Sequence, residues 1–523
     1  MLKHKKIICF FSILFLVGGA WAQKKEKALS LEDCILKAMK NNLNVAVEVL
    51  NPELADISIS RAKENFLPSL SFGYSLQNTN SPSFSFIEAE EKISTEYKDY
   101  SASIFQRIPT GGEFSISLYS YKNESNMRFL SVNPRYASTL RFNFTQPILK
   151  NFGFKISRKE IIIAQNNRAI SEGQLRGVLM DTIYNVESAY WNFVYSIENL
   201  KVKRQSLELA QDLLAKSKRE VDVGTLAPIE ILSAQTEVAS READILQAEA
   251  MVKNNEDLLK TIINLAAEEK GVEADIIPVD KPAFAKKEVS LEDALFTALE
   301  NRPDLQASRI DVQNKEINLS YARNQLLPDL SLQASYWSPG ISGTKIIYDP
   351  LDPFGPPIMT IPGGSSAALR DAVDFKYKNW SVGLTLSIPL NSVLSRAEYA
   401  QARVNLDQAM FRLENQEQQI FLEIKNAVRA VQTDYKRVHA YKIARELAEK
   451  KLEAEAKKLK VGLTTNYVVV QYQRDLANAR SAELQAIIDY NLSLARLDKA
   501  LGTTLKNKNI RFSDISEDIK RKT

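Results

Sequence analysis

Two long segments of the chain place apolar residues at every third or fourth position. They cover residues 157–222 and 395–460, and each has 66 residues with almost no Pro or Gly. This spacing predicts amphipathic helices, and at about 1.5 Å per residue each helix would be roughly 100 Å long. Shorter helical segments follow at 228–266 and 464–501. The sequence therefore predicts two long helical hairpins.

Four other segments alternate apolar and polar residues, which predicts β-strands over 69–77, 139–147, 329–337 and 378–389. Strands that cross an outer membrane in a barrel need about 9 to 11 residues. The aromatic residues expected at lipid-facing or interfacial positions are Tyr74, Phe142, Phe144, Tyr336, Trp337 and Trp380. A soluble β-sandwich with these aromatic residues in its core is an open alternative.

Residues 100–121 are predicted to form a further hairpin, which turns at Thr110-Gly111-Gly112. This hairpin either lies outside the membrane or adds strands to the barrel, and the sequence leaves both open. An unpaired sheet edge in lipid costs several kcal/mol per backbone group. Four strands per chain therefore imply an oligomer, and three chains would supply about 12 strands.

The chain is an internal duplication. Ser-Leu-Glu-Asp occurs at 30–33 and 290–293, and Leu-Pro occurs at 67–68 and 327–328, so both pairs lie 260 positions apart. The Ser and Asp of the first motif have the spacing of a variant helix capping box. The predicted organisation begins with a signal peptide at 1–22 and ends with a C-terminal tail at 506–523. The first repeat, at 23–280, has a helix, barrel strands within about 69–147 and a helical hairpin over 155–266. The second repeat, at 281–505, has a helix, barrel strands within about 329–389 and a helical hairpin over 391–501.

The first repeat departs from the second after its opening helix. Val45, Val47 and Val49 alternate as in a strand, and Asn51-Pro52 has the residue types of a helix start. We therefore expect the next helix to begin near Asn51 or to kink there.

The first 22 residues have a basic start, an apolar run over 7–17, and Ala20 and Ala22 at a predicted cleavage site. This is the layout of a cleavable secretory signal, and the apolar run is shorter than the roughly 20 residues that a membrane-spanning anchor needs. Removing three lysines lowers the net charge from +4 to +1, which favours neither nucleic acid nor an anionic surface as a partner. Cys34 then remains alone, so we expect a small buried side chain and no intramolecular disulfide.

The residues give no indication of an enzyme. His439 is the only histidine after the signal, and the chain has no phosphate-binding Gly-Lys-Ser/Thr loop, no Gly-x-Ser-x-Gly motif and no Cys or His pair. We therefore expect no catalytic residues, no metal site and no cofactor.

The duplicated Ser-Leu-Glu-Asp starts, the Leu-Pro entries into strands, Gln146-Pro147 and Ile388-Pro389 at strand ends, and the paired Val-Gly turns together resemble the TolC-like outer-membrane efflux family. The resemblance implies an α+β membrane protein of the cell outer membrane. It would be a trimeric β-barrel, with about four strands per chain, that a long α-helical barrel continues into the periplasm. The implied function is the passive exit channel of a tripartite efflux pump, with a periplasmic adaptor and an inner-membrane transporter as partners.

The resemblance also implies where functional contacts lie. The adaptor would dock on the hairpin ends, formed by Val223, Gly224, Thr225 and Leu226 and by Val461, Gly462, Leu463 and Thr464. The family often closes its channel with acidic residues six and nine positions after the second glycine, where this chain has Val468 and Gln471. Glu230, six positions after Gly224, is an alternative constriction residue. A plain helix C-cap explains the glycines equally well.

Two other functions remain open. The same fold serves type I protein secretion, and the sequence does not identify the exported substrate or the class of transporter. A soluble periplasmic coiled-coil scaffold, from another class, is favoured if the alternating segments are core strands.

Overall fold

The computed structural model describes residues 25–510 apart from 86–87, 90, 266–273 and 352–354. The predicted signal peptide and most of the predicted tail lie outside the described residues. The chain forms two compact units, one from residues 1–46, 179–294 and 424–523 and the other from 47–178 and 295–423. Each unit takes segments from both halves of the chain, because the long helices run from one unit into the other.

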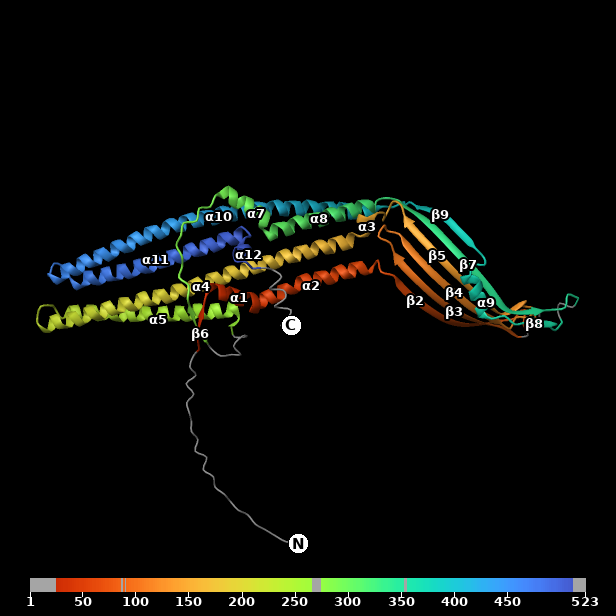
Figure 1. The fold of residues 1–523 in the computed structure, drawn as a ribbon, viewed down its shortest axis with the longest axis horizontal. Helices are drawn as coiled ribbons and strands as arrows, with labels where there is room; N and C mark the ends of the chain where they lie inside the picture. The colour runs from red at the N-terminus through yellow and green to blue at the C-terminus, as the bar shows by residue number, and fades with distance from the viewer. Residues whose placement is uncertain (1–24, 86–87, 90, 266–273, 352–354, 511–523) are drawn as a thin grey trace, which may run out of the picture. The chain divides into compact units, whose positions relative to one another are not determined.

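One unit contains a seven-stranded antiparallel sheet (Figure 1). Its strands lie in the order β2-β3-β4-β5-β7, after which β7 pairs with β9 along one part of its length and with β8 along another. The four segments predicted as strands all lie in this sheet, which confirms them. The strands are β2 (Ser69–Pro82), β3 (Lys92–Arg107), β4 (Glu113–Ser125), β5 (Val132–Pro147), β7 (Asp329–Ile347), β8 (Met359–Ile361) and β9 (Asn379–Ser387).

The expected count of about four strands per chain is too low. The hairpin that the sequence left undecided is β3 and β4, and it lies inside the sheet between β2 and β5. Over the described residues, this sheet therefore has six long strands, and the short β8 is its seventh. The sequence predicts this hairpin but does not place it in the sheet, because charged residues such as Lys98, Asp99 and Lys122 interrupt the alternation of apolar and polar positions that is expected of barrel strands.

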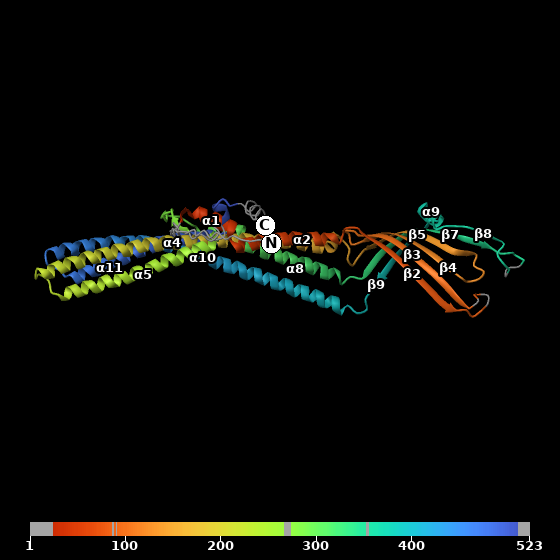
Figure 2. The ribbon, with the colours of Figure 1, turned by 90° about the horizontal axis from the view of Figure 1, so that it is seen from below.

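The two faces of the sheet differ in polarity, because cross-strand neighbours share a face and successive residues alternate between faces. Tyr74, Tyr100, Ser120 and Ser138 form one row across the sheet. The next row on the same face toward Leu70 is apolar and consists of Phe72, Ala102, Leu118 and Leu140, whereas the next row in the other direction includes Lys98 and Lys122. This face, the apolar face, includes Leu70, Phe72, Ile104, Ile116, Leu118, Leu140, Phe142, Tyr336, Trp380, Val382, Leu384 and Leu386. The opposite face, the polar face, is mostly Ser, Thr, Asn and Gln. Figure 2 shows the backbone of the same sheet from below.

A short helix, α9 (Ser365–Val373), packs on the apolar face over β5 and β7. Its Ala368 and Ala372 are fully buried, and a Cβ on Gly340 of β7 would lie only 2.0 Å from the Ala368 carbonyl oxygen. Phe375, just after the helix, stacks on Phe142 and Tyr336 at centroid distances of 6.0 and 5.4 Å. Small residues therefore let α9 lie directly on the sheet.

The helices of the sheet-bearing unit are joined by polar contacts. The side chain of Asn314 in α8 (Pro303–Asn324) bonds to Asn166 at 2.8 Å and to Asn167 at 3.1 Å, both in α4 (Lys159–Asp222). Arg302 donates to Asp304 and, at 2.6 Å, to Glu423 of α10 (Val393–Lys460). A short helix, α3 (Phe154–Ser157), links β5 to α4.

The helix expected to start near Asn51 begins earlier. α2 spans Leu43–Glu64 with Pro52 inside it. Val45 and Val49 are buried, whereas Val47 is 64% exposed. Residues four apart share a helix face, so Val45 and Val49 form one buried stripe of the helix while Val47 lies on its exposed side.

The other unit holds both hairpin ends and the remaining elements. The two strands β1 (Lys25–Leu29) and β6 (Ala274–Pro278) pair in parallel. The helices are α1 (Leu31–Asn41), α5 (Ile229–Ile263), α11 (Asn466–Ala500) and α12 (Thr504–Asn507). The first four residues of α7 (Leu291–Asn301) also belong to this unit. None of the helices over the described residues combines the length and apolar character needed to span a bilayer.

The predicted cap at the start of α1 is confirmed. The Asp33 amide donates to Ser30 Oγ, and the Ser30 amide donates to Asp33 Oδ2, both at 3.1 Å. The hydrogen bonds from Ser30 lower the pKa of Asp33. Cys34 is fully buried, as the sequence predicted. Burial raises the pKa of its thiol to about 12, and a buried thiol of this kind is unreactive.

Candidate functional site at the helical hairpin ends

The two hairpin turns have the same backbone geometry. Gly224 and Gly462 have φ values of 76° and 74°, in the left-handed region that favours glycine. The residue after each glycine donates its amide five positions back, Thr225 to Glu220 at 2.8 Å and Leu463 to Lys458 at 3.0 Å. Each glycine amide also bonds three positions back. This is the Schellman motif that ends helices, so the predicted C-caps are present in both turns.

The ends of the hairpins expose large apolar side chains. Val223 is 74% exposed, Val461 69% and Leu463 76%, while Leu226 and Thr464 are half-buried. No atom lies within 4 Å of a Cβ built on either glycine. Such clustered exposed apolar residues are typical of interaction sites.

The predicted constriction residues do not form a joint site within one chain. Glu230 is half-buried in the first turn of α5, Val468 is half-buried in α11, and Gln471 is exposed. Over the described residues, no hydrogen bond or ion pair joins Glu230 to either of the other two. Any ring made by these residues would need further copies of the chain.

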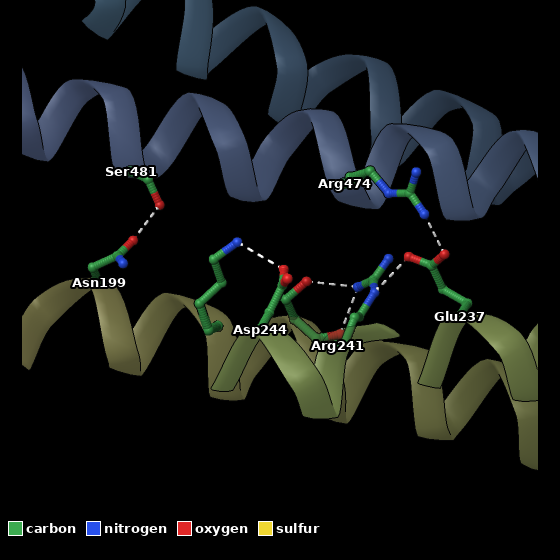
Figure 3. Close-up of polar contacts among 8 residues, drawn as sticks. Asn199, Glu237, Arg241, Asp244, Arg474 and Ser481 are labelled. Carbon is green, nitrogen blue, oxygen red and sulfur yellow. Dashed lines mark hydrogen bonds and ion pairs between the residues drawn. The ribbon is translucent and has the colours of Figure 1, made fainter. Parts of the chain in front are cut away.

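The sequence missed a set of polar contacts that join the two hairpins (Figure 3). Glu237 of α5 is 8% exposed and accepts a hydrogen bond from Arg474 of α11. Glu237 also accepts from Arg241 at 2.8 Å, and Arg241 donates to the carbonyl and hydroxyl of Ser206, each at 2.6 Å. We call the Glu237–Arg474 contact the hairpin link.

Further contacts between the hairpins support the link. Ser481 donates to Asn199 at 2.7 Å, as Figure 3 shows, and Arg480 donates to Gln205 at 2.7 Å. Nearer the ends, the buried Asn466 donates to Ser217 Oγ at 3.0 Å. By contrast, the ion pair between Lys203 and Asp244, at 2.9 Å, lies within the first hairpin.

The contact within α5 had a signal in the sequence, whereas the hairpin link had none. Glu237 and Arg241 have the i, i+4 spacing of a helical ion pair, whereas Arg474 lies 237 positions after its partner. Repeat symmetry does not reveal the pair either, because the two repeats do not carry the same residues at these positions. Among the described residues, no group of three His, Cys, Asp or Glu side chains is placed to hold a metal ion.

Comparison with known proteins adds the family and the fold. The sequence profile described as outer membrane efflux protein matches residues 34–265 and 295–503. The outer membrane protein TolC of Vibrio cholerae is 22% identical over 367 residues, which are 69% of this chain and 76% of that protein.

Two solved structures have a similar fold. The outer-membrane channel OprN matches with a TM-score of 0.64 at 17% identity over 90% of each chain. The CmeC outer membrane channel of Campylobacter jejuni matches with a TM-score of 0.61 at 16% identity over 98% of this chain and 99% of that one.

Proposed function

The chain belongs to the outer membrane efflux protein family, and we propose that three copies of it form the passive exit channel of a tripartite pump. As a member of this family, the protein is an outer-membrane efflux channel. In the proposal, an inner-membrane transporter supplies the energy and a periplasmic adaptor connects the two. The protein itself then needs no catalytic residue.

The observation that carries the proposal is the two-faced sheet. Leu70, Phe72, Val382 and Leu384 on the apolar face are each more than 60% exposed, which suits contact with lipid, whereas the polar face suits a water-filled lumen. Cell fractionation tests this reading. We expect the mature protein in the outer-membrane fraction, and recovery in the soluble periplasm would support the coiled-coil scaffold instead.

We further propose that the hairpin ends dock the adaptor. Three copies would present six Schellman turns with Val223, Val461 and Leu463 exposed, and an adaptor with apolar pockets would cover them. Channel closure would then occur close by. Because Val468 and Gln471 replace acidic residues, we propose that the constriction is apolar or polar at that level, with Glu230 as its acidic contribution.

Replacing both tip glycines by tryptophan should abolish adaptor binding. A side chain at these φ values costs roughly 1–2 kcal/mol per residue, and the open space around each glycine allows the indole to project into the proposed docking surface. We expect the Gly224→Trp/Gly462→Trp protein to lose at least ten-fold in adaptor recovered by in-cell crosslinking.

The matched control is Gly224→Ala/Gly462→Ala, which carries the same backbone strain without the bulk. It should keep most adaptor binding, and both variants should remain trimeric in size-exclusion chromatography. Equal loss in both variants would mean that turn geometry, rather than a docking surface, is what the glycines provide.

A further inference from the structure

The sheet of one chain has two unpaired edges, and we propose that β2 of one copy pairs with β9 of the next, so that three copies close an 18-stranded barrel. This inference rests on the trimer of the proposed function. Among the described strands, β2 pairs with β3 alone and β9 with β7 alone. We call the β2–β9 contact between copies the seam.

The inserted hairpin is an integral part of the sheet. β3 pairs with β2 over 14 positions and with β4 over 13, and β4 pairs with β5 over 11. Removing the β3–β4 hairpin would break the β2–β3 and β4–β5 ladders. A ring built from four strands per chain would therefore lack the hydrogen bonds of both ladders. Six long strands per chain in three chains give 18.

The strand directions are correct for closure. Five antiparallel steps lead from β2 to β9, so these two edges run in opposite directions. The seam is then antiparallel like the other pairs of long strands. In lipid, open edges would leave backbone groups unpaired at several kcal/mol each, so closure is strongly favoured.

The register within one chain indicates how the seam pairs. The row of directly paired residues that starts at Ser69 runs through Phe105, Ser115, Asn143 and Ser335 to Ser381. Ser381 lies six positions before Ser387, the last residue of β9. If the first residue of β2 lies opposite the last residue of β9 at the seam, Ser69 pairs with Ser387. Following the row of paired residues once across a copy then shifts the register by six residues, and the shift around the whole ring is 18 residues. A shear equal to the strand number gives a tilt of about 35°, within the range of known barrels.

This register matches the side chains on both faces. The apolar pairs are Leu70 with Leu386, Phe72 with Leu384, Tyr74 with Val382 and Leu76 with Trp380, and all eight side chains are 56–76% exposed in one copy. The polar pairs are Ser71 with Thr385, Ser75 with Ser381 and Gln77 with Asn379. A shift of one residue would move every apolar residue to the wrong face, and pairing beyond Ser387 would bring in Pro389, which has no amide proton.

The seam predicts a wide outer-membrane section. With strands about 4.8 Å apart and tilted by about 35°, 18 strands enclose a backbone diameter of roughly 34 Å, against roughly 22 Å for 12 strands at the same tilt. Barrels of 16–18 strands leave an aqueous channel. We therefore expect the helical part, rather than the sheet, to set the size of the cargo.

Cysteine crosslinking tests the seam. Residues paired across antiparallel strands have Cα atoms about 4.5–5.5 Å apart, within the range of a disulfide. We expect oxidised Ser71→Cys/Thr385→Cys protein to run as a covalent trimer on a non-reducing gel, because each copy joins both neighbours. Native Cys34 is buried and stays out of the reaction. The control, Ser71→Cys/Asn379→Cys, has both residues on the same face but six positions out of register and should remain monomeric on the gel.

The results of these experiments distinguish a failure of the seam proposal from a failure of the trimer proposal. Trimers in size-exclusion chromatography that fail to crosslink at Ser71 and Thr385, or that crosslink equally in the control, would overturn the seam while leaving the proposed function intact. Electron cryo-microscopy of the purified trimer should count 18 strands, and 12 would overturn the proposal. A protein that is monomeric in the outer membrane would overturn both.

Discussion

The Leu384→Arg variant is expected to fail to assemble in the outer membrane. Leu384 lies at the middle of β9 on the apolar face and is 67% exposed. An arginine on the lipid face near the bilayer midplane costs about 2–4 kcal/mol, and a trimer would carry three. The amount of folded trimer in the outer-membrane fraction should fall by at least ten-fold.

Thr385→Arg is the control for this effect. It adds the same side chain to the next residue of the same strand, but on the polar face, where a lumen supplies water. We expect nearly normal assembly. If the two variants assembled equally well, the assignment of the faces to lipid and lumen would be wrong.

Arg474→Ala is expected to raise the open fraction of the channel. The variant removes the hairpin link but leaves the buried Glu237 with its partner Arg241. Glu237 is buried but Arg474 is 58% exposed to solvent, so we use the value of about 0.2–1 kcal/mol that applies to exposed ion pairs. We expect opening to separate the two hairpins and break the link in each copy, so the loss of three links in a trimer should shift the closed–open equilibrium by about 3- to 150-fold. Mean conductance in planar bilayers measures this shift.

Lys203→Ala is the matched control, because it removes an ion pair within the first hairpin rather than between hairpins. Its conductance should equal that of the native protein. Glu237→Ala is a poorer probe, because it would leave the 5% exposed Arg241 without its carboxylate, and an unpaired buried charge destabilises a protein by about 3–5 kcal/mol. Identical conductance of Arg474→Ala and Lys203→Ala would exclude the hairpin link from channel closure.

Local patterns predicted much of the fold because local physics determines it. The capping box at Ser30, the glycine caps of both turns and the four alternating strands each depend on residues close together in the sequence. Val45 and Val49 show the limit of such patterns, since a spacing of four positions suits both a strand and a helix. The burial of Val45 and Val49 on one side favours the helix, and the helix accommodates Pro52 within it.

The features that the sequence missed depend on distant pairing. The hairpin of β3 and β4 is a strand pair because β2 and β5 lie on either side of it, although charges such as Lys98 and Asp99 obscure its alternation. The hairpin link likewise joins Glu237 to Arg474 across two separate helices. The hairpin itself has a local signal in its Gly-Gly turn, but its place in the sheet and the hairpin link have none, so both required the arrangement of the chain in space.

The central claim is that this protein is a channel, and planar-bilayer recording of the purified trimer tests it most directly. We expect discrete conductance steps from the native protein, small or infrequent in the closed form, and larger or more frequent steps from the Arg474→Ala protein. Protein shown to be inserted in the bilayer that stays electrically silent in both native and Arg474→Ala forms would contradict it.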